Sequence, residues 1–272
     1  MTIRNSDSGD GRSPPQSQDT DFFQKVAFPS TGSLAIPDDE IHVWRVALDA
    51  GTPVEAQLAQ LLSVDEQDRL LRFHSSSDRR RFAIRRGTLR MLLSAYTGIP
   101  GAELRFTHGK NGKPGLDQRS DYLLPCFNTS ASANRALIAI SGKIPVGVDI
   151  EYMRPIDEIH DIASKYFSAQ ERDSLAELPR DLQPGGFYRI WTSKEAIIKA
   201  DGRGLSMPLN SFVVSSDPGE PPQLLQTTEG MDSSRDWILY GLNPGKQFAC
   251  ALAATRPNLV IRTRALDLTQ MA

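Results

Sequence analysis

The alternation of apolar and polar positions along the chain predicts two successive blocks of helices and strands. The first block opens with an apolar strand, continues with helices whose leucines recur at helical spacing, and closes with short apolar runs typical of buried strands. Strands are expected at 41–46, 104–107, 136–140 and 146–150. Two helices are expected across 54–74, the second capped by Ser63, and a third from 77 to 96, ending at Gly98.

The second block repeats this order. Ser168 with Glu171 three residues later resembles a capping box, and the run Pro184-Gly185-Gly186 is expected to interrupt the chain before the next helix. Helices are expected at 156–167, 168–178 and 187–200, and strands at 212–214, 237–242, 248–253 and 260–264. The two blocks together predict an α+β fold.

A repeated spacing indicates that the two blocks are copies of one fold. Gly98 lies eight residues before Phe106, and Gly204 lies eight residues before Phe212, each pair joining a helix end to a strand. Two fused copies would carry a site between them. We expect residues 1–37 to be mostly disordered, 38–146 to form an N-terminal half and 147–265 a C-terminal half that carries the chemistry.

Composition and charge narrow the class of protein. The 272 residues include 31 Lys and Arg against 33 Asp and Glu, so no global basic field favours a nucleic-acid partner. Cys126 and Cys250 are the two cysteines, too few for a disulfide framework, and no apolar run approaches the ~18 residues of a membrane helix. We expect a cytoplasmic monomer with neither a nucleic-acid nor a membrane partner.

Two carboxylates share one face of a predicted strand. In Gly147-Val148-Asp149-Ile150-Glu151, residues two apart project to the same side, so Asp149 and Glu151 point together. Adjacent carboxylates repel each other, and a cation bound by oxygen ligands, Mg²⁺ or Mn²⁺ rather than zinc, relieves the repulsion. The alternative is a turn at Asp149 with Glu151 in solvent, and the spacing alone leaves both open.

A second polar cluster lies on the predicted helix at 187–200. Glu195 and Lys199 are four residues apart, so a carboxylate and an ammonium could face one pyrophosphate. A Glu followed four residues later by a Lys is also the commonest stabilising pair on helix surfaces. The six arginines between Arg79 and Arg90 suit phosphate capture, and equally a solvated helix face.

The two clusters in combination resemble a known family. Gly-Val-Asp-Ile-Glu at 147–151, followed by Trp-x-x-Lys-Glu-Ala-x-x-Lys at 191–199 and Gly-x-Gly-Leu at 202–205, resembles the 4′-phosphopantetheinyl transferase superfamily. The pattern is most similar to the surfactin-synthetase-activating branch, whose members are single chains of two pseudo-repeated halves. The resemblance runs from about Arg72 to Val214 and includes Arg-Phe-His at 72–74, Gly-Lys-Pro at 112–114 and Phe-Asn-Thr-Ser at 127–130.

The resemblance implies an enzyme that transfers 4′-phosphopantetheine from coenzyme A to a serine of an apo acyl or peptidyl carrier protein, releasing adenosine 3′,5′-bisphosphate. It implies Mg²⁺, or Mn²⁺, bound by Asp149, Glu151 and Glu195, with Glu195 and Lys199 as catalytic residues. The carrier would dock on the helices at 156–178 and the loop after them. The residues implied to contact coenzyme A are Arg72, Arg81, Arg86, Lys113, Ser130 and Lys199.

One position departs from the family pattern. The family usually has Ser-His-Ser where this chain has Ser130-Ala131-Ser132, and the histidine would meet the 3′-phosphate of coenzyme A. Losing one charge-assisted hydrogen bond of ~1.5–3 kcal/mol predicts an altered enzyme rather than an inactive one. The alternatives are a non-catalytic protein of the same fold that binds carriers or coenzyme A, and a nucleic-acid regulator that uses the Arg79–Arg90 helix.

Overall fold

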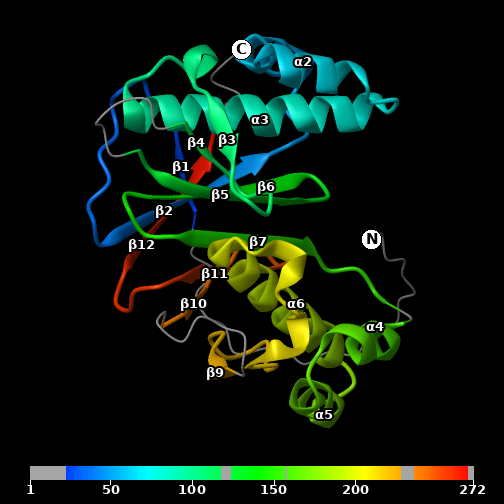
Figure 1. Ribbon diagram of the computed structural model, residues 1–272. Coiled ribbons are helices and arrows are strands. Elements are labelled where there is room, and N and C mark those ends of the chain that lie inside the picture. Colours follow the sequence, from blue (N-terminus) through cyan, green and yellow to red (C-terminus); the bar gives the residue numbers. More distant parts are fainter. Residues whose placement is uncertain (1–22, 118–123, 157, 228–235, 269–272) are drawn as a thin grey trace. The chain divides into compact units, whose positions relative to one another are not determined.

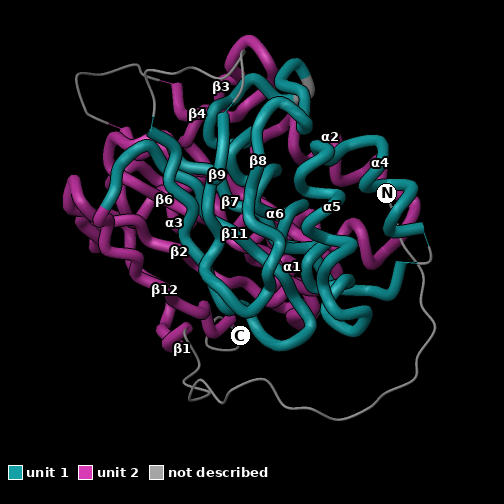
Figure 2. The backbone as a smooth tube through the Cα atoms, turned by 90° about the horizontal axis from the view of Figure 1, so that it is seen from below, with its two compact units in different colours: residues 1–22, 146–257 teal, residues 23–145, 258–272 magenta. Residues whose placement is uncertain are grey.

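The protein is described from a computed structural model that covers residues 23–117, 124–156, 158–227 and 236–268. Contacts within the chain divide it into two compact units. Unit 1 contains residues 146–257, and unit 2 contains residues 23–145 together with the chain from 258 onward (Figure 2). No helix in the described part of the chain is long and apolar enough to cross a membrane. Each unit combines helices with sheet, which confirms the predicted α+β class.

Unit 2 is a five-stranded sheet whose one face is crossed by the long helix α3 (Figure 1). The strand order is β1-β12-β2-β6-β5, with β1, β12 and β2 parallel and the β2-β6-β5 pairs antiparallel. Buried side chains such as Trp44, Leu58, Leu92 and Ile138 form the core between helices and sheet. The elements are β1 (Gln24–Val26), β2 (Glu40–Ala47), α1 (Thr52–Ala59), α2 (Val64–Leu71), α3 (Ser76–Thr97), the 3₁₀ turn η1 (Gly101–Glu103), β3 (Phe106–His108), β4 (Pro114–Leu116), β5 (Cys126–Ser132), β6 (Arg135–Ser141) and β12 (Val260–Leu266).

Unit 1 packs one long helix, α6, against the three-stranded antiparallel sheet β10-β11-β7 (Figure 1). Its core contains Ile190, Ile197 and Ala251, all fully buried. The elements are β7 (Val146–Tyr152), α4 (Ile159–Tyr166), α5 (Ala169–Glu177), α6 (Gln183–Asp201), the 3₁₀ turns η2 (Gly204–Ser206) and η3 (Leu209–Ser211), β8 (Phe212–Val214), β9 (Leu224–Thr227), β10 (Ile238–Gly241) and β11 (Phe248–Ala254).

A buried cation anchors the long helix of unit 2 to its neighbours. Ser63 and Glu66 form a capping box at the start of α2, and the Glu66 carboxylate also pairs with Arg90 of α3 at 2.6 Å. Arg90 Nη1 donates to the carbonyls of Gly101 and Leu104, at 2.7 and 2.9 Å, at the two ends of η1. One side chain therefore joins two helices and the turn that follows them.

Unit 1 contains the same arrangement with lysine in place of arginine. Ser168 and Glu171 form the capping box of α5, as the sequence predicted, and Glu171 pairs with Lys194 of α6 at 2.7 Å. Lys194 Nζ donates to the carbonyls of Leu209 and Phe212, at 2.5 and 2.6 Å, at the two ends of η3. Removing one partner of such a buried pair typically costs about 3–5 kcal/mol, so each anchor fixes its helix strongly.

The two anchors establish the internal repeat. Arg90 and Lys194 each lie eight residues before the glycine that caps its helix in the left-handed conformation, Gly98 with φ 72° and Gly202 with φ 84°. The repeat predicted from Gly98 and Gly204 is therefore real, but its second helix ends at Gly202. Gly204 begins η2, an extra turn that unit 2 lacks among its described residues.

Three expectations about the chain's organisation differ from the structure. Residues 1–22 lie outside the described residues, but the rest of the segment expected to be disordered contains β1, and Phe23 is fully buried under the guanidinium of Arg45. β12 pairs with β2 in the sheet of unit 2, although the sequence placed it in the second half. Pro184 lies in the first turn of α6 instead of breaking the chain, because an N–H is not needed there.

Candidate active site

A glycine lets the strand β7 approach the helix α6 unusually closely. A Cβ atom on Gly147 would lie 2.1 Å from the carbonyl oxygen of Ala196 and 2.3 Å from the amide nitrogen of Ala200. Both are backbone atoms of α6, which cannot rotate away. The absence of a side chain at 147 therefore sets the distance between this strand and this helix.

The same face of β7 carries the predicted carboxylates. Residues two apart share a face of a strand, so Gly147, Asp149 and Glu151 all project toward α6. Asp149 is only 2% exposed, and its Oδ1 accepts a hydrogen bond of 2.6 Å from Lys199 Nζ. The alternative of a turn at Asp149 is therefore wrong, because Asp149 lies within a strand, and Lys199 does more than pair with Glu195, because it is also bonded to Asp149.

The third carboxylate, Glu195, lies on α6 within electrostatic range of Asp149. Burial raises the pKa of Glu195 above its usual range, the negative charge of Asp149 raises it further, and the ammonium of Lys199 acts in the opposite direction. Two carboxylates in a poorly solvated site are disfavoured together unless positive charge accompanies them. The site thus contains two neighbouring carboxylates, Asp149 and Glu195, and one ammonium group, Lys199.

This donor set suits a hard divalent cation. Asp149 and Glu195 offer only oxygen ligands, which Mg²⁺ and Mn²⁺ prefer, and a cation would relieve the repulsion that raises the pKa of Glu195. Within the described residues, no three carboxylates, histidines or cysteines lie close enough together to form a complete metal site. Glu151 shares the face of Asp149 but is not gathered with both of the others, so its role as a ligand stays a prediction.

Unit 2 does not carry this chemistry. In the repeat defined by Arg90 and Lys194, the positions of Glu195 and Lys199 correspond to Met91 and Ala95 on α3. Neither residue can bind a cation or a phosphate. The duplicated fold therefore contains one set of acid–lysine residues, in unit 1.

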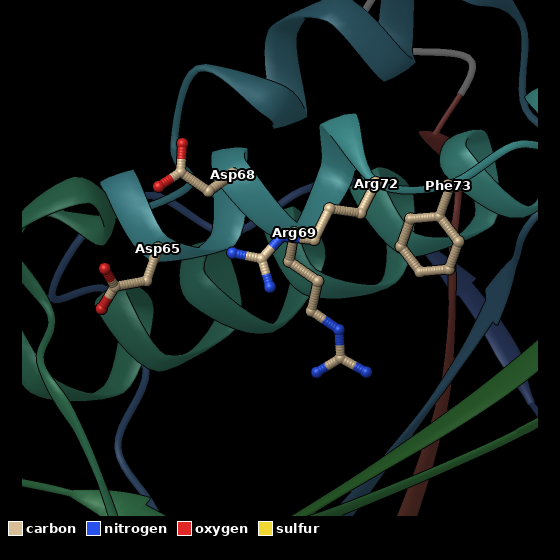
Figure 3. A pocket seen from close by; sticks show the side chains of 5 residues that line it. All are labelled: Asp65, Asp68, Arg69, Arg72 and Phe73. Atoms are coloured by element: carbon tan, nitrogen blue, oxygen red, sulfur yellow. The ribbon is translucent and has the colours of Figure 1, made fainter.

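Apart from Lys199, the residues predicted to contact coenzyme A all belong to unit 2. Arg72, at the end of α2, lines a cavity of about 580 Å³ whose other described lining residues are Asp65, Asp68, Arg69 and Phe73 (Figure 3). Arg69 and Arg72 are three residues apart on one helix face, and both guanidinium groups extend to the same side of α2 in Figure 3. Arg69 was not among the residues predicted from the sequence, although its helical spacing from Arg72 was the available signal.

The arginines of α3 are less uniform than the sequence suggested. Arg86 forms an ion pair with Glu66, and its guanidinium lies 3.9 Å from the centroid of the Phe106 ring. Arg90 is buried in the anchor, and Arg80 pairs with Glu55 at 3.0 Å. These contacts give Arg86 a structural role, and its contact with coenzyme A stays a prediction. Arg81 is exposed and stays a candidate.

Lys113 and Ser130 lie on neighbouring elements of unit 2. Lys113 is in the turn between β3 and β4, and its positive charge acts on the thiol of Cys126 at the start of β5, whose pKa burial raises. Ser130 is buried on β5, and Ala131 next to it is exposed and pairs with Ala136 in the β5–β6 hairpin. The convergence of these residues and Arg72 on one ligand stays a prediction.

Comparison with known proteins agrees with this organisation. The 4′-phosphopantetheinyl transferase superfamily matches residues 145–253, and the N-terminal domain of 4′-phosphopantetheinyl transferases matches residues 52–144. The junction between the two matches coincides with the start of unit 1 at Val146. The two family domains therefore correspond to the two copies of the repeat, apart from β1, β2 and β12, which lie outside both matches.

Several curated relatives carry the same activity in their names. The chain is 35% identical to the 4′-phosphopantetheinyl transferase HetI of Nostoc sp. over 85% of its own length and 94% of the relative. It is 32% identical to Sfp of Bacillus subtilis over 56% of its length and 66% of the relative. It is 27% identical to the human L-aminoadipate-semialdehyde dehydrogenase-phosphopantetheinyl transferase over 71% of its length and 66% of the relative. The chain therefore belongs to the 4′-phosphopantetheinyl transferase superfamily, as an enzyme of its two-domain, Sfp-like type.

Proposed function

We propose that this enzyme transfers 4′-phosphopantetheine from coenzyme A to a serine of an apo acyl or peptidyl carrier protein, with the chemistry carried out at the β7–α6 face of unit 1. The observation that carries the proposal is the contact of Lys199 with Asp149, beside Glu195, on the one helix–strand face that has no counterpart in unit 2.

Lys199 is proposed to hold the phosphate at the reacting centre. Its side chain is 27% exposed, so it is partly buried and still accessible to a substrate. As the bond to the leaving nucleotide breaks, negative charge accumulates on the pyrophosphate, and a fixed cation stabilises that state more than the ground state. The neighbouring Asp149 orients the ammonium before the substrate arrives.

Glu195 is proposed to accept the proton of the attacking serine, directly or through a water molecule. A carboxylate within hydrogen-bond reach of the attacking hydroxyl can accept its proton as a general base. Its position on α6, four residues before Lys199, places acceptor and ammonium on one face of the helix. Both groups could then serve a single serine and a single phosphate.

Mg²⁺ or Mn²⁺ is the proposed metal, bound by Asp149 and Glu195, with Glu151 as the third ligand. A divalent ion in phosphoryl transfer neutralises charge on the phosphate oxygens. The chain's own residues contribute the rigid support: β7 fixes Asp149, and the Gly147 contact fixes α6 with Glu195. Coenzyme A would contact Arg72, Arg81, Lys113 and Ser130, and the carrier would dock on α4 and α5.

A transfer assay with mass readout tests the proposal. The enzyme is incubated with coenzyme A, Mg²⁺ and a panel of apo acyl and peptidyl carriers, and each carrier is weighed by intact-protein mass spectrometry. We expect at least one carrier to gain the mass of one phosphopantetheine group, and the same carrier with its acceptor serine changed to alanine to gain none. Unmodified carriers throughout a panel that a reference transferase modifies would refute the proposal.

A further inference from the structure

The hydroxyl of Tyr188 holds the backbone at the point where β7 leaves its sheet. Tyr188 lies on α6 and is 3% exposed. Its hydroxyl accepts a hydrogen bond of 3.0 Å from the amide of Arg154 and donates one of 3.1 Å to the carbonyl of the same residue. Both backbone groups of Arg154 are therefore bound by one side chain.

These bonds begin where the strand ladder stops. β7 pairs with β11 through Tyr152, and the amide of Met153 donates to the carbonyl of Gln247 at 2.8 Å. Arg154 is the next residue, and its backbone is bonded to Tyr188 of α6 instead of to a neighbouring strand. Without the hydroxyl, fraying would start at Arg154, three residues after Glu151, which is the penultimate residue of the strand.

Tyr188 also lies in line with the proposed catalytic groups. Tyr188, Glu195 and Lys199 are spaced seven and four residues apart, so they form one stripe along α6. Burial raises the pKa of the Tyr188 phenol, and among the smaller causes the negative charge of Glu151 raises it further. The phenol is therefore close enough to Glu151 to feel its charge.

The fold itself does not require a hydroxyl at this position. In unit 2, the residue that corresponds to Tyr188 is Ile84, six residues before Arg90 as Tyr188 is six residues before Lys194. Ile84 is fully buried and apolar. The position thus has a hydroxyl in unit 1, which carries Glu195 and Lys199, and an apolar side chain in unit 2, which does not carry them.

We infer that Tyr188 is a positioning residue, which fixes the end of β7 so that the carboxylate of Glu151 is held toward α6 for metal binding. The inference rests on the proposed function, because it takes Glu151 as a metal ligand. Tyr188 touches no reacting atom and acts through the backbone of residues 152–154. Residues that orient ligands from behind typically change metal affinity 10- to 100-fold when they are altered.

The test compares Tyr188→Phe with a matched control, Tyr96→Phe. Tyr96 is a tyrosine of unit 2 whose hydroxyl also has two partners, His42 Nδ1 at 2.6 Å and Trp44 Nε1 at 3.0 Å. Each variant keeps its ring and loses the hydrogen bonds of its hydroxyl, which for Tyr96 include a further one with Arg264. Mn²⁺ binding is measured directly by the electron paramagnetic resonance of free Mn²⁺, without carrier, and the Mg²⁺ dependence of transfer is measured separately.

We expect Tyr188→Phe to weaken Mn²⁺ binding about tenfold and to raise the Mg²⁺ concentration needed for half-maximal transfer by the same factor, with Tyr96→Phe unchanged in both. In a double-mutant cycle, Tyr188→Phe should add nothing to Glu151→Gln, because the tyrosine acts through that carboxylate. Wild-type Mn²⁺ affinity in Tyr188→Phe, equal losses in the two tyrosine variants, or additive effects with Glu151→Gln would overturn the inference. A wild-type enzyme that transfers without any metal would instead overturn the proposed metal site, and the inference with it.

Discussion

The close approach of β7 and α6 makes Gly147→Ala the sharpest test of the site's geometry. The new methyl group would meet the Ala196 carbonyl oxygen at 2.1 Å, the Ala200 nitrogen at 2.3 Å and the Ala200 Cα at 2.9 Å. All three are backbone atoms, so no side-chain rotation relieves the contact. The helix and the strand must separate.

The size of the separation follows from the contact distance. Ordinary van der Waals contact begins at 3.4 Å, so α6 must retreat by about 1.3 Å from the oxygen that lies 2.1 Å away. Glu195 and Lys199 lie on α6, and Asp149 stays with β7, so the contact of 2.6 Å between Lys199 and Asp149 is lost. A displacement of ~1 Å at a reacting centre can reduce the rate about 100-fold, and overpacking typically costs ~1–3 kcal/mol of stability.

The assay measures the initial rate of carrier modification at saturating coenzyme A, together with the thermal unfolding midpoint. Gly142→Ala is the control, because a Cβ there meets the carboxylate of Asp38 at 3.5 Å and the backbone of Ile36 at 3.7 Å, both ordinary contacts. We expect Gly147→Ala to lose about 100-fold in rate while it still unfolds cooperatively, and Gly142→Ala to keep the wild-type rate. A Gly147→Ala enzyme with normal rate would mean that the β7–α6 spacing does not position the catalytic groups.

Three further outcomes follow from the site. Burial and the charge of Asp149 raise the pKa of Glu195 in the folded protein, so the carboxyl group ionises first in the unfolded chain. The free energy of unfolding therefore falls as pH rises from about 4.5 toward the folded pKa. Glu195→Gln in metal-free buffer should abolish this fall, and an unchanged pH–stability curve would contradict the prediction. Lys199→Ala should lower kcat at saturating coenzyme A, whereas a change confined to KM would make Lys199 a plain binding residue. Ala131→His should lower KM for coenzyme A by up to ~10- to 100-fold and leave dephospho-coenzyme A unchanged, and equal improvement for both ligands would show that position 131 does not face the 3′-phosphate.

Local sequence was sufficient where the determining contacts are themselves local. The capping box of Ser168 and Glu171 lies within four residues, and the structure has it as predicted. The prediction of a chain break at Pro184-Gly185-Gly186 was wrong, because packing against residues distant in sequence determines the conformation of this run. A Cβ on Gly186 would meet Leu178 Cδ1 at 2.4 Å and the Ser216 carbonyl oxygen at 3.0 Å, so this glycine of α6 allows close packing against segments outside the helix and does not break the chain.

The same distinction applies to the charged residues. Lys194 lies in the motif that identified the family, but its partners Glu171 and Phe212 are far away in sequence, so its anchoring role could not be predicted. Arg86 was assigned to coenzyme A from the family resemblance, and sequence could not show that Glu66, twenty residues earlier, pairs with it. Helical periodicity places a charge on a face, and only the fold decides what that face meets.

The metal dependence of transfer in wild-type enzyme and in Asp149→Asn tests the central claim most directly. Carrier modification is measured by intact mass against Mg²⁺ concentration, starting from exhaustively chelated protein. The account predicts no transfer without metal and a saturable rise with Mg²⁺ for the wild type, and no Mg²⁺-activated transfer for Asp149→Asn, whose Lys199 partner is otherwise intact. Full transfer after chelation, or a normal Mg²⁺ response in Asp149→Asn, would contradict it.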